Sequence, residues 1–333
     1  MIVFFTGSYP PSKCGVGDYL YKLIANILPH HSNVKVIKNS LLEFIFYAIS
    51  NRKAIRHVNI QYPTIGYASN YLSAFKPHFV TLIARFLGIR VSITLHEFTS
   101  LSSKARFFAN IFKIANNIVA TSEYEHENLV KFGFNKDRVI VIPIGSNIKE
   151  SDVKDKTIDF INFGIISPGK GIEDFLYVIE KIRVDYETLK VVLAGYIPDN
   201  SEYADKIIAQ AKQLNIEFKP NQTEDELSIL VGESKRAILP YSDGISERRG
   251  TALAAMINKC VVYSYAGNSS EAFNTICMLA RDRDELYNKL IDALHTDSAD
   301  DCFIAKAYEY ALARHWDKVS EKYLRMFYEN CSK

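Results

Sequence analysis

Cysteine is scarce in this 333-residue chain, and its five copies are too scattered to build a disulfide framework or a zinc site. No CxxC pair occurs, so we expect reduced, buried thiols, as in a reducing compartment. No apolar run reaches the roughly 18 residues of a membrane-spanning helix, and the start, 1–5, predicts a strand and not a signal peptide. These absences favour a cytoplasmic protein. The cysteines are Cys14, Cys260, Cys277, Cys302 and Cys331.

Acidic residues are also rare in one part of the chain. Between positions 52 and 116 there are nine lysines and arginines, opposed by Glu97 alone. Residues 1–150 hold 17 basic against 8 acidic side chains, whereas residues 151–333 hold 23 against 30. The overall charge of +2 therefore conceals a basic half and an acidic half, which suggests that one face meets an anionic surface.

Short apolar strands and amphipathic helices alternate along the whole chain. Strands are expected at 2–6, 34–37, 57–62, 91–95, 118–121, 139–142, 159–163, 190–194, 216–219, 236–239 and 261–263. Helices are expected at 20–28, 41–50, 79–87, 101–117, 123–132, from 172, at 202–213, 224–233, 250–258 and 269–274, and through the tail 282–332. This alternation predicts an α/β fold with parallel sheets.

The charged, weakly apolar stretch 146–157 is expected to be a linker. It divides the chain into Rossmann-like domains at 1–150 and 151–333, facing each other across a cleft, the default ligand site. The sequence allows the last helix to pack back on the first domain, with Trp316 where the chain folds back.

The stretch 239–256 combines a strand end, a polar turn with Arg248 and Arg249, and an Ala-rich helix. Backbone N–H groups at a helix start, the helix dipole and guanidinium groups together form an anion site that suits phosphate. A solvated polar loop is the structural alternative. The position after a buried strand favours the anion site, because open α/β sheets bind ligands beyond the carboxyl ends of their strands.

The loop after the first strand contains Gly15-Val16-Gly17, which lets backbone N–H groups approach a phosphate; an ordinary turn is the alternative. Leu20 stands where a dinucleotide fingerprint has its third glycine, which argues against NAD. The basic residues carry no nucleic-acid reader motif.

These motifs, taken in order, resemble the GT-B-fold retaining glycosyltransferases of family 4 (group 1). The resemblance covers nearly the whole chain. It depends on Pro10-Pro11 with Gly15-Val16-Gly17, Thr94-Leu95-His96-Glu97, Ile142-Pro143-Ile144-Gly145, Phe163-Gly164 with Lys170-Gly171, and Leu193-Ala194-Gly195. It implies transfer of a sugar, of hexose type, from a nucleotide-sugar held by the second domain to an acceptor held by the first. It also implies retention at the anomeric carbon, and no cofactor or obligatory metal.

Lys170 lies in a Pro-Gly-Lys-Gly turn before a helix, where its ammonium can meet the diphosphate leaving group. The family often has an arginine five residues earlier, but here that position is Ile165. We therefore expect Arg248 and Arg249 to supply the missing cation. The resemblance makes Lys170, Arg248, Arg249 and His96 the catalytic candidates.

The usual carboxylate pair of the family, Glu-x7-Glu, is missing. Its two positions fall on Ser246 and Ala254, and the chain resembles a subset with Asp-Gly-Ile-Ser-x-Arg-Arg-Gly-Thr instead. Asp243 or Glu247 is then a candidate for sugar hydroxyls, and Ser246 and Thr251 for phosphate. The donor-binding candidates are Gly15, Gly17, Gly164, Lys170, Asp243, Ser246, Glu247, Arg248, Arg249, Gly250 and Thr251.

His96 matches a histidine that in relatives lies near the transferred sugar. Because these enzymes are thought to let the leaving phosphate take the acceptor's proton, His96 would position a reactant and not attack it. A capping or core histidine is the alternative. Gln61, Tyr62 and Glu97 complete the acceptor-side candidates.

The expected helix 101–117 and its basic neighbours suit an anionic membrane surface or a lipid diphosphate, or else form an ordinary solvated face. The resulting expectation is a cytoplasmic enzyme, peripheral on the inner face of the membrane, that builds surface polysaccharide such as lipopolysaccharide, or glycolipid. Two alternatives stay open: a nucleotide-sugar epimerase or hydrolase of the same fold, and a non-catalytic partner subunit that binds a nucleotide-sugar.

Overall fold

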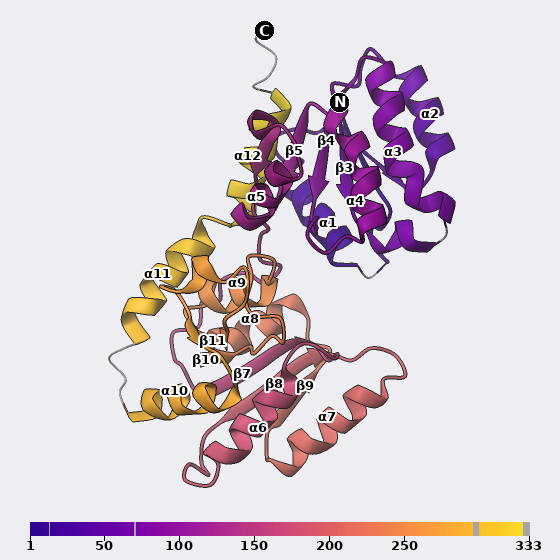
Figure 1. The fold of residues 1–333 in the computed structure, drawn as a ribbon. Coiled ribbons are helices and arrows are strands. Elements are labelled where there is room, and N and C mark those ends of the chain that lie inside the picture. The colour runs from indigo at the N-terminus through magenta and orange to yellow at the C-terminus, as the bar shows by residue number, and fades with distance from the viewer. Residues whose placement is uncertain (13, 70, 296–299, 329–333) are drawn as a thin grey trace. The chain divides into compact units, whose positions relative to one another are not determined.

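The computed structural model describes residues 1–12, 14–69, 71–295 and 300–328. The chain forms two compact units, one made of Met1–Ile144 with Trp316–Lys333 and the other of Gly145–His315 (Figure 1). Each unit contains one six-stranded sheet, and all strand pairs that the structure describes are parallel. The expected α/β fold with two Rossmann-like sheets is confirmed.

The first sheet has the order β2-β1-β3-β4-β5-β6. Its strands are β1 (Ile2–Thr6), β2 (Val34–Lys38), β3 (His57–Tyr62), β4 (Arg90–Leu95), β5 (Asn117–Ala120) and β6 (Val139–Val141). The helices of this unit are α1 (Gly15–Ile27), α2 (Leu41–Ser50), η1 (Ile65–Ser69), α3 (Tyr71–Phe86), α4 (Ser103–Ala109), η2 (Asn110–Ile114), α5 (Glu123–Lys131), η3 (Lys136–Arg138) and α12 (Trp316–Tyr328).

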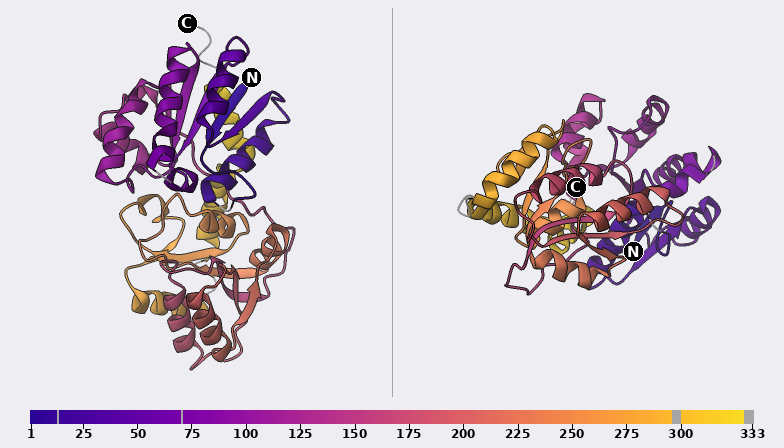
Figure 2. Two further views of the ribbon diagram at one scale, coloured as in Figure 1. Left: turned by 90° about the vertical axis from the view of Figure 1, so that its right-hand side faces the viewer. Right: turned by 90° about the horizontal axis from the view of Figure 1, so that it is seen from below.

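Helices cover both faces of this sheet. α2, α3 and η2 pack on the apolar core that contains Val3 and Phe5, while α1 and α12 pack on the core that contains Ile2 and Phe4. The alternation of side chains along β1 explains this division. The final helix α12 thus completes the first sheet from the far end of the sequence, and it appears in yellow against that sheet in Figure 2.

The second sheet has the order β12-β11-β10-β7-β8-β9. Its strands are β7 (Ile158–Ile165), β8 (Val191–Tyr196), β9 (Glu217–Pro220), β10 (Ser234–Ile238), β11 (Val261–Tyr265) and β12 (Met278–Ala280). Its helices are α6 (Ile172–Ile182), α7 (Glu202–Gln213), α8 (Glu224–Gly232), α9 (Gly250–Ile257), η4 (Glu271–Phe273), α10 (Arg283–His295) and α11 (Asp300–Leu312).

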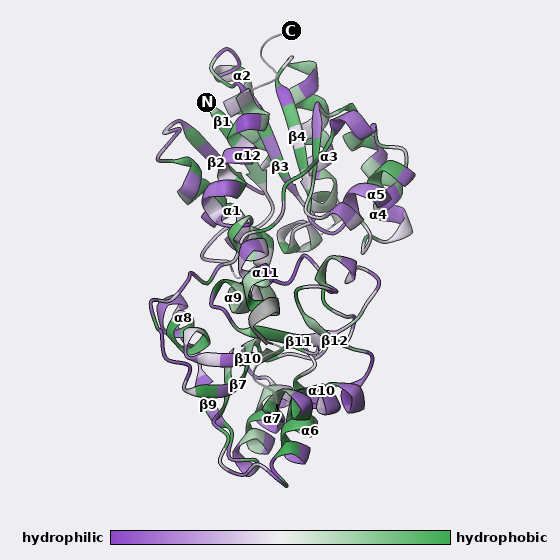
Figure 3. Cartoon of the chain, turned by 90° about the vertical axis from the view of Figure 1, so that its left-hand side faces the viewer, coloured by the Kyte–Doolittle hydropathy of each residue, from purple (hydrophilic) through white to green (hydrophobic). Residues whose placement is uncertain are grey.

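α6, α7 and α10 pack on one face of this sheet, opposite α8 and α9 (Figure 1). Helices α6 and α7 show both hydrophobic and hydrophilic residues in Figure 3, as expected of helices that bury one side. Cys14, Cys260 and Cys277 are free and buried, as predicted; Cys331 and the side chain of Cys302 lie outside what the structure describes.

Three expected elements differ from the structure, and one strand was not expected. The helix expected at 101–117 ends at Ala109, because Asn116 hydrogen-bonds Val91 through its backbone and side chain and leads into β5. The element expected as a helix at 269–274 is the single turn η4, and the three-residue strand β12 was missed. The helix expected at 79–87 begins at Tyr71 and contains Pro77.

The expected linker belongs to the second unit, whose boundary lies six residues before the one drawn on the sequence. Its backbone is fastened there: Ser151 N donates to Asn258 Oδ1 over 2.8 Å, and Lys149 O accepts bonds from Ser228 and Asn258. Residues 316–328 belong to the first unit, as the sequence allowed for the last helix, because α12 buries Trp316, Tyr323 and Phe327 against it. The division of the chain into two units depends on which side chains are buried together and which strands pair, and the distribution of charge along the sequence does not show it.

Candidate functional site

The second unit has a topological switch point between β7 and β10. The chain runs outward from β7 through β8 to β9, then returns to place β10 on the other side of β7. The loops that leave these two strands therefore diverge at their carboxyl ends, where open α/β sheets bind ligands. Lys170 lies in the loop after β7, and Arg248 and Arg249 lie in the loop after β10.

These two loops touch through glycines. A Cβ on Gly171 would lie 1.7 Å from the carbonyl oxygen of Pro240, so only glycine allows this approach. Gly169 and Gly171 both have positive φ, and the Gly169 carbonyl accepts a hydrogen bond from Ser242 Oγ at 3.1 Å. The turn that carries half-buried Lys170 is thereby fixed against the start of the arginine loop.

Arg249 is oriented by its neighbours. Its guanidinium forms an ion pair with Asp243 and lies 4.4 Å from the centre of the Tyr241 ring. Tyr241 in turn hydrogen-bonds Thr251 Oγ1, and burial raises the pKa of Tyr241 to about 12, which keeps it protonated. Asp243 and Thr251, candidates for sugar and phosphate, are thus joined to Arg249 in one cluster.

Helix α9 begins directly after the arginines. Its first turn contains no acidic residue, and no side chain caps it, whereas the first turn of α6 contains Glu173 and Asp174. The hydroxyl of Ser246 is buried and has no hydrogen-bond partner among the described residues. Candidates Gly164 and Gly250 lie at the same edge, where a Cβ on Gly164 would contact Thr251 at 3.5 Å. The positive helix end, the arginines and this hydroxyl can hold an anion.

Glu247 is engaged differently. Its Oε1 accepts a 2.8 Å hydrogen bond from Arg314, just after α11, and one of 3.2 Å from Tyr310, in the last turn of α11. The Arg314 guanidinium also lies 3.4 Å from the centre of the Tyr310 ring. Glu247 therefore fastens the loop to α11, a contact that the sequence did not indicate.

In the first unit, His96 closes a buried hydrogen-bonded network. His96 Nε2 bonds Gln61 Oε1 at 2.7 Å, and the Gln61 amide donates to Asn59 and Thr94. Asn59 donates to Ser92, which also bonds His57 at 2.9 Å. These residues alternate along β3 and β4, so their side chains lie on one face of the sheet. That alternation of polar residues within apolar strands was readable in the sequence but was missed.

Two tyrosines from distant parts of the chain complete this network. The Tyr323 hydroxyl of α12 bonds Thr94 Oγ1 at 2.9 Å and receives a 3.1 Å bond from Tyr19 of α1. The Tyr19 ring meets the His96 ring edge-on, with centroids 4.9 Å apart. Burial lowers the pKa of both His57 and His96 to about 3, so both imidazoles are neutral at pH 7. His96 is thus suited to hydrogen bonding.

The other first-unit candidates have separate surroundings. Tyr62 is buried among Tyr67, His78 and Phe112 on the opposite face of the sheet, while Glu97 is exposed. Gly15 and Gly17 lie in the first turn of α1 and not in the loop expected from the sequence. Gly15 has open space around it, whereas a Cβ on Gly17 would lie 3.2 Å from the backbone of Ser8. Gln61 and His96 therefore lie in one network that does not include Tyr62.

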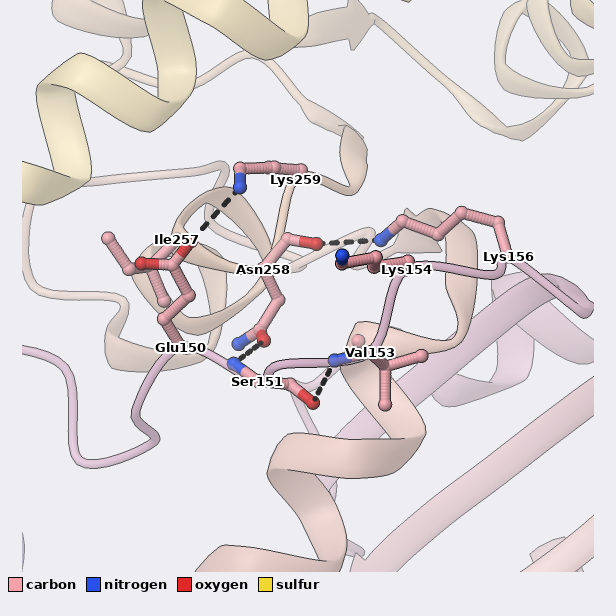
Figure 4. A pocket seen from close by; sticks show the side chains of 9 residues that line it. Glu150, Ser151, Val153, Lys154, Lys156, Ile257, Asn258 and Lys259 are labelled. Carbon is pink, nitrogen blue, oxygen red and sulfur yellow. Dashed lines mark hydrogen bonds and ion pairs between the residues drawn. The ribbon is translucent and has the colours of Figure 1, made fainter.

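A pocket in the second unit lies away from these candidates. The close-up in Figure 4 shows two contacts in this pocket, the Lys259–Glu150 ion pair and the hydrogen bond from Lys156 Nζ to Asn258 O. They lie beside the stretch that was expected to be a linker. No sequence-predicted site residue lines the pocket. Among the described residues, no group of three or more His, Cys, Asp or Glu is placed to hold a metal ion, and no helix is long and apolar enough to cross a membrane.

One protein-family model matches the first part of the chain. Residues 4–150 match the model of Glycosyltransferase Family 4. No curated protein matches the chain significantly.

Solved structures match over almost the full length. Alr3699/HepE of Anabaena in complex with UDP has a TM-score of 0.73 and 13% identity, and the match covers 98% of this chain and 99% of that one. A glycosyltransferase from Rickettsia africae has a TM-score of 0.72 and 13% identity, with 100% and 99% covered. TarM has a TM-score of 0.63 and 17% identity, with 88% of this chain and 59% of that chain covered. Residues 4–150 thus resemble glycosyltransferase family 4, and the whole chain has the two-domain fold of these solved glycosyltransferase structures.

Proposed function

We propose that this glycosyltransferase moves a sugar, with retention, from a nucleotide-sugar to a glycan or lipid-linked acceptor during synthesis of surface polysaccharide or glycolipid. One observation carries the proposal. At the switch point of the second sheet, the Lys170 turn touches the loop that carries Arg248 and Arg249, at the open N-terminus of α9. Fixed cations at a developing diphosphate charge lower the barrier to its departure.

The nature of the donor follows by analogy. HepE has been crystallised with UDP-glucose, and pneumococcal GtfA, an O-GlcNAc transferase, with UDP and GlcNAc. We therefore propose a uridine diphosphate sugar as the first donor class to test. The buried Ser246 hydroxyl and the first-turn amides of α9 would hold the diphosphate, and Lys170 with Arg248 or Arg249 would neutralise it. His96, neutral and hydrogen-bonded to Gln61, would position a sugar or acceptor hydroxyl.

Thermal unfolding with UDP, GDP and their sugars is the first experiment. A nucleotide present well above its dissociation constant should raise the melting temperature by mass action. Lys170→Ala and Arg249→Ala should abolish that rise. Arg281→Ala, at a side chain that is 85% exposed and paired with Glu285, removes the same charge elsewhere and should leave the rise intact. A rise that survives in both site variants would contradict the proposed site.

Measuring the products of turnover then distinguishes sugar transfer from epimerisation, from hydrolysis and from binding without catalysis. Incubation of the nucleotide-sugar with a panel of glycan and lipid-linked acceptors should give a glycoside of unchanged anomeric configuration by NMR. Transfer is expected to continue in EDTA, since the proposed charges on the diphosphate are those of the protein. Products formed without acceptor would indicate an epimerase or hydrolase, and binding without any turnover would indicate a partner subunit.

A further inference from the structure

Helix α2 exposes apolar side chains on its outer face. Its inward residues Phe44 and Ala48 are fully buried, but Leu42, Phe46 and Ile49 lie on the opposite side. Phe46 is 70% exposed. The spacing of four and then three residues aligns the three side chains in one stripe along the helix.

Helix α3 shows the same arrangement. Val80 and Ala84 face the core and are fully buried. Leu72, Phe79, Leu82 and Phe86 all point outward, and Phe86 is 89% exposed. Their spacing of seven, three and four residues again places them on one side of the helix.

The two stripes belong to neighbouring helices. α2 and α3 pack side by side (Figure 1), and Arg52 Nε, just after α2, donates a 2.7 Å hydrogen bond to Leu87 O, just after α3. We call the seven outward residues of the two helices the α2–α3 face: Leu42, Phe46, Ile49, Leu72, Phe79, Leu82 and Phe86. So many large apolar side chains, on two adjacent helices, indicate an interaction surface.

Basic residues surround the α2–α3 face. No aspartate or glutamate occurs between Glu43 and Glu97, and Glu43 itself is paired with Lys35 at 3.1 Å. Lys53 follows α2, and Arg85 adjoins Phe86; both are exposed, and the Arg85 guanidinium meets the uncharged side chain of Asn116. The face therefore combines apolar side chains with positive charge, as in helices that lie in an anionic lipid interface.

We infer that the α2–α3 face docks this protein on an anionic phospholipid bilayer. Phe46 and Phe86 enter the headgroup–acyl boundary, and Lys53 and Arg85 meet the lipid phosphates. A second copy of the chain is disfavoured as the occupant, because pairing two such faces would bring their cationic rims together. The inference concerns a surface of the first unit alone and does not depend on the proposed transfer reaction. It differs from the stretch 101–117 expected from the sequence, which is not one helix.

Sedimentation of the full chain with lipid vesicles tests whether the α2–α3 face binds an anionic bilayer. The protein should pellet with vesicles of phosphatidylcholine mixed with phosphatidylglycerol, and much less with phosphatidylcholine alone. Phe46→Ser with Phe86→Ser should weaken binding about a hundredfold. Lys53→Gln with Arg85→Gln should weaken it about tenfold, and only on the anionic vesicles. Val184→Ser, at a 76% exposed valine of the second unit, should change nothing.

Three results would overturn the inference: no binding of the unaltered chain to anionic vesicles, equal binding by the Phe46→Ser/Phe86→Ser variant, or light scattering that shows a dimer lost in that variant. All the substituted side chains are exposed, so the variants should fold. Their thermal shift with nucleotides should match that of the unaltered chain, which separates lost docking from a failed donor site.

Discussion

The two sheets share a strand topology at their carboxyl ends, but the loops that follow the strands carry different side chains. Each sheet has a switch point, between β1 and β3 in the first unit and between β7 and β10 in the second. At both points a glycine accepts close backbone contact: a Cβ on Gly66 would lie 1.8 Å from Gly7 O, and one on Gly171 would lie 1.7 Å from Pro240 O. The second unit adds Lys170, Arg248 and Arg249 to the adjoining loops.

In the first unit, the polar side chains instead lie along β3 and the next strand, β4, in the buried network that ends at His96. In the second unit, the cationic side chains of Lys170, Arg248 and Arg249 lie on loops that are fixed by a close glycine contact. In the first unit, neutral groups are held by each other. The same sheet geometry can therefore support either an electrostatic site or a hydrogen-bonding site, depending on which side chains the loops and strands supply.

The largest expected effect concerns the cations. Lys170→Ala should lower the rate of sugar transfer about 100-fold to 1,000-fold, the usual loss when one group that stabilises transition-state charge is removed. Gln61→Ala in the first unit should lower it less, because it only orients His96. Steady-state kinetics on both variants measures the difference. A smaller loss for Lys170→Ala than for Gln61→Ala would reverse the assignment of roles.

Titration of buried histidines should come next. His57 has its pKa lowered by burial to about 3, below its ordinary value of 6.5, so the unfolded chain binds more protons as pH falls below about 6.5. Above pH 6.5, neutral His57 makes its full contribution to the free energy of unfolding. At pH 4.5 that free energy should be lower by about 2 to 3 kcal/mol.

Urea unfolding of the chain and of His57→Gln, at pH 7 and pH 4.5, checks this. The variant should lose less stability between the two pH values than the unaltered chain. Equal losses would show that His57 is not the group that titrates. His30→Gln, at an exposed histidine of the same unit, is the matched control.

The glycine contact in the second unit should have a smaller effect on stability. Gly171→Ala forces a Cβ against the Pro240 carbonyl at a φ of +71°, so we expect about 1 to 3 kcal/mol of destabilisation. Gly250→Ala, where a Cβ meets nothing within 4 Å, should not destabilise. Urea unfolding compares the two. A lost nucleotide-induced thermal shift in Gly171→Ala alone would tie the close contact to the donor site.

The smallest expected effect is at the junction of α12. Tyr323→Phe removes the hydroxyl that bonds Thr94 and Tyr19, and should cost about 1 kcal/mol. If the network positions His96, the Michaelis constant for one substrate should also rise. Tyr328→Phe, at the end of the same helix, removes a hydroxyl that bonds His31 and should leave that constant unchanged.

The alternating strands and helices, the parallel sheets and the resemblance to family 4 could all be predicted from the amino-acid sequence. These follow from local signals, since apolar periodicity and glycine turns act over a few residues. The sequence also singled out Lys170 and Arg248-Arg249, because each lies after an apolar strand.

Only the tertiary structure decided which of these residues meet. The contact of Gly171 with Pro240 joins positions 69 residues apart, and the bond between Thr94 and Tyr323 spans 229 residues. The pairing of Glu247 with Arg314 likewise depends on where α11 packs. Such contacts depend on burial and register across the whole fold, and no short pattern along the chain encodes them. For the same reason the apolar stripes of α2 and α3, readable as periodic, could be recognised as outward-facing only once the core had been seen.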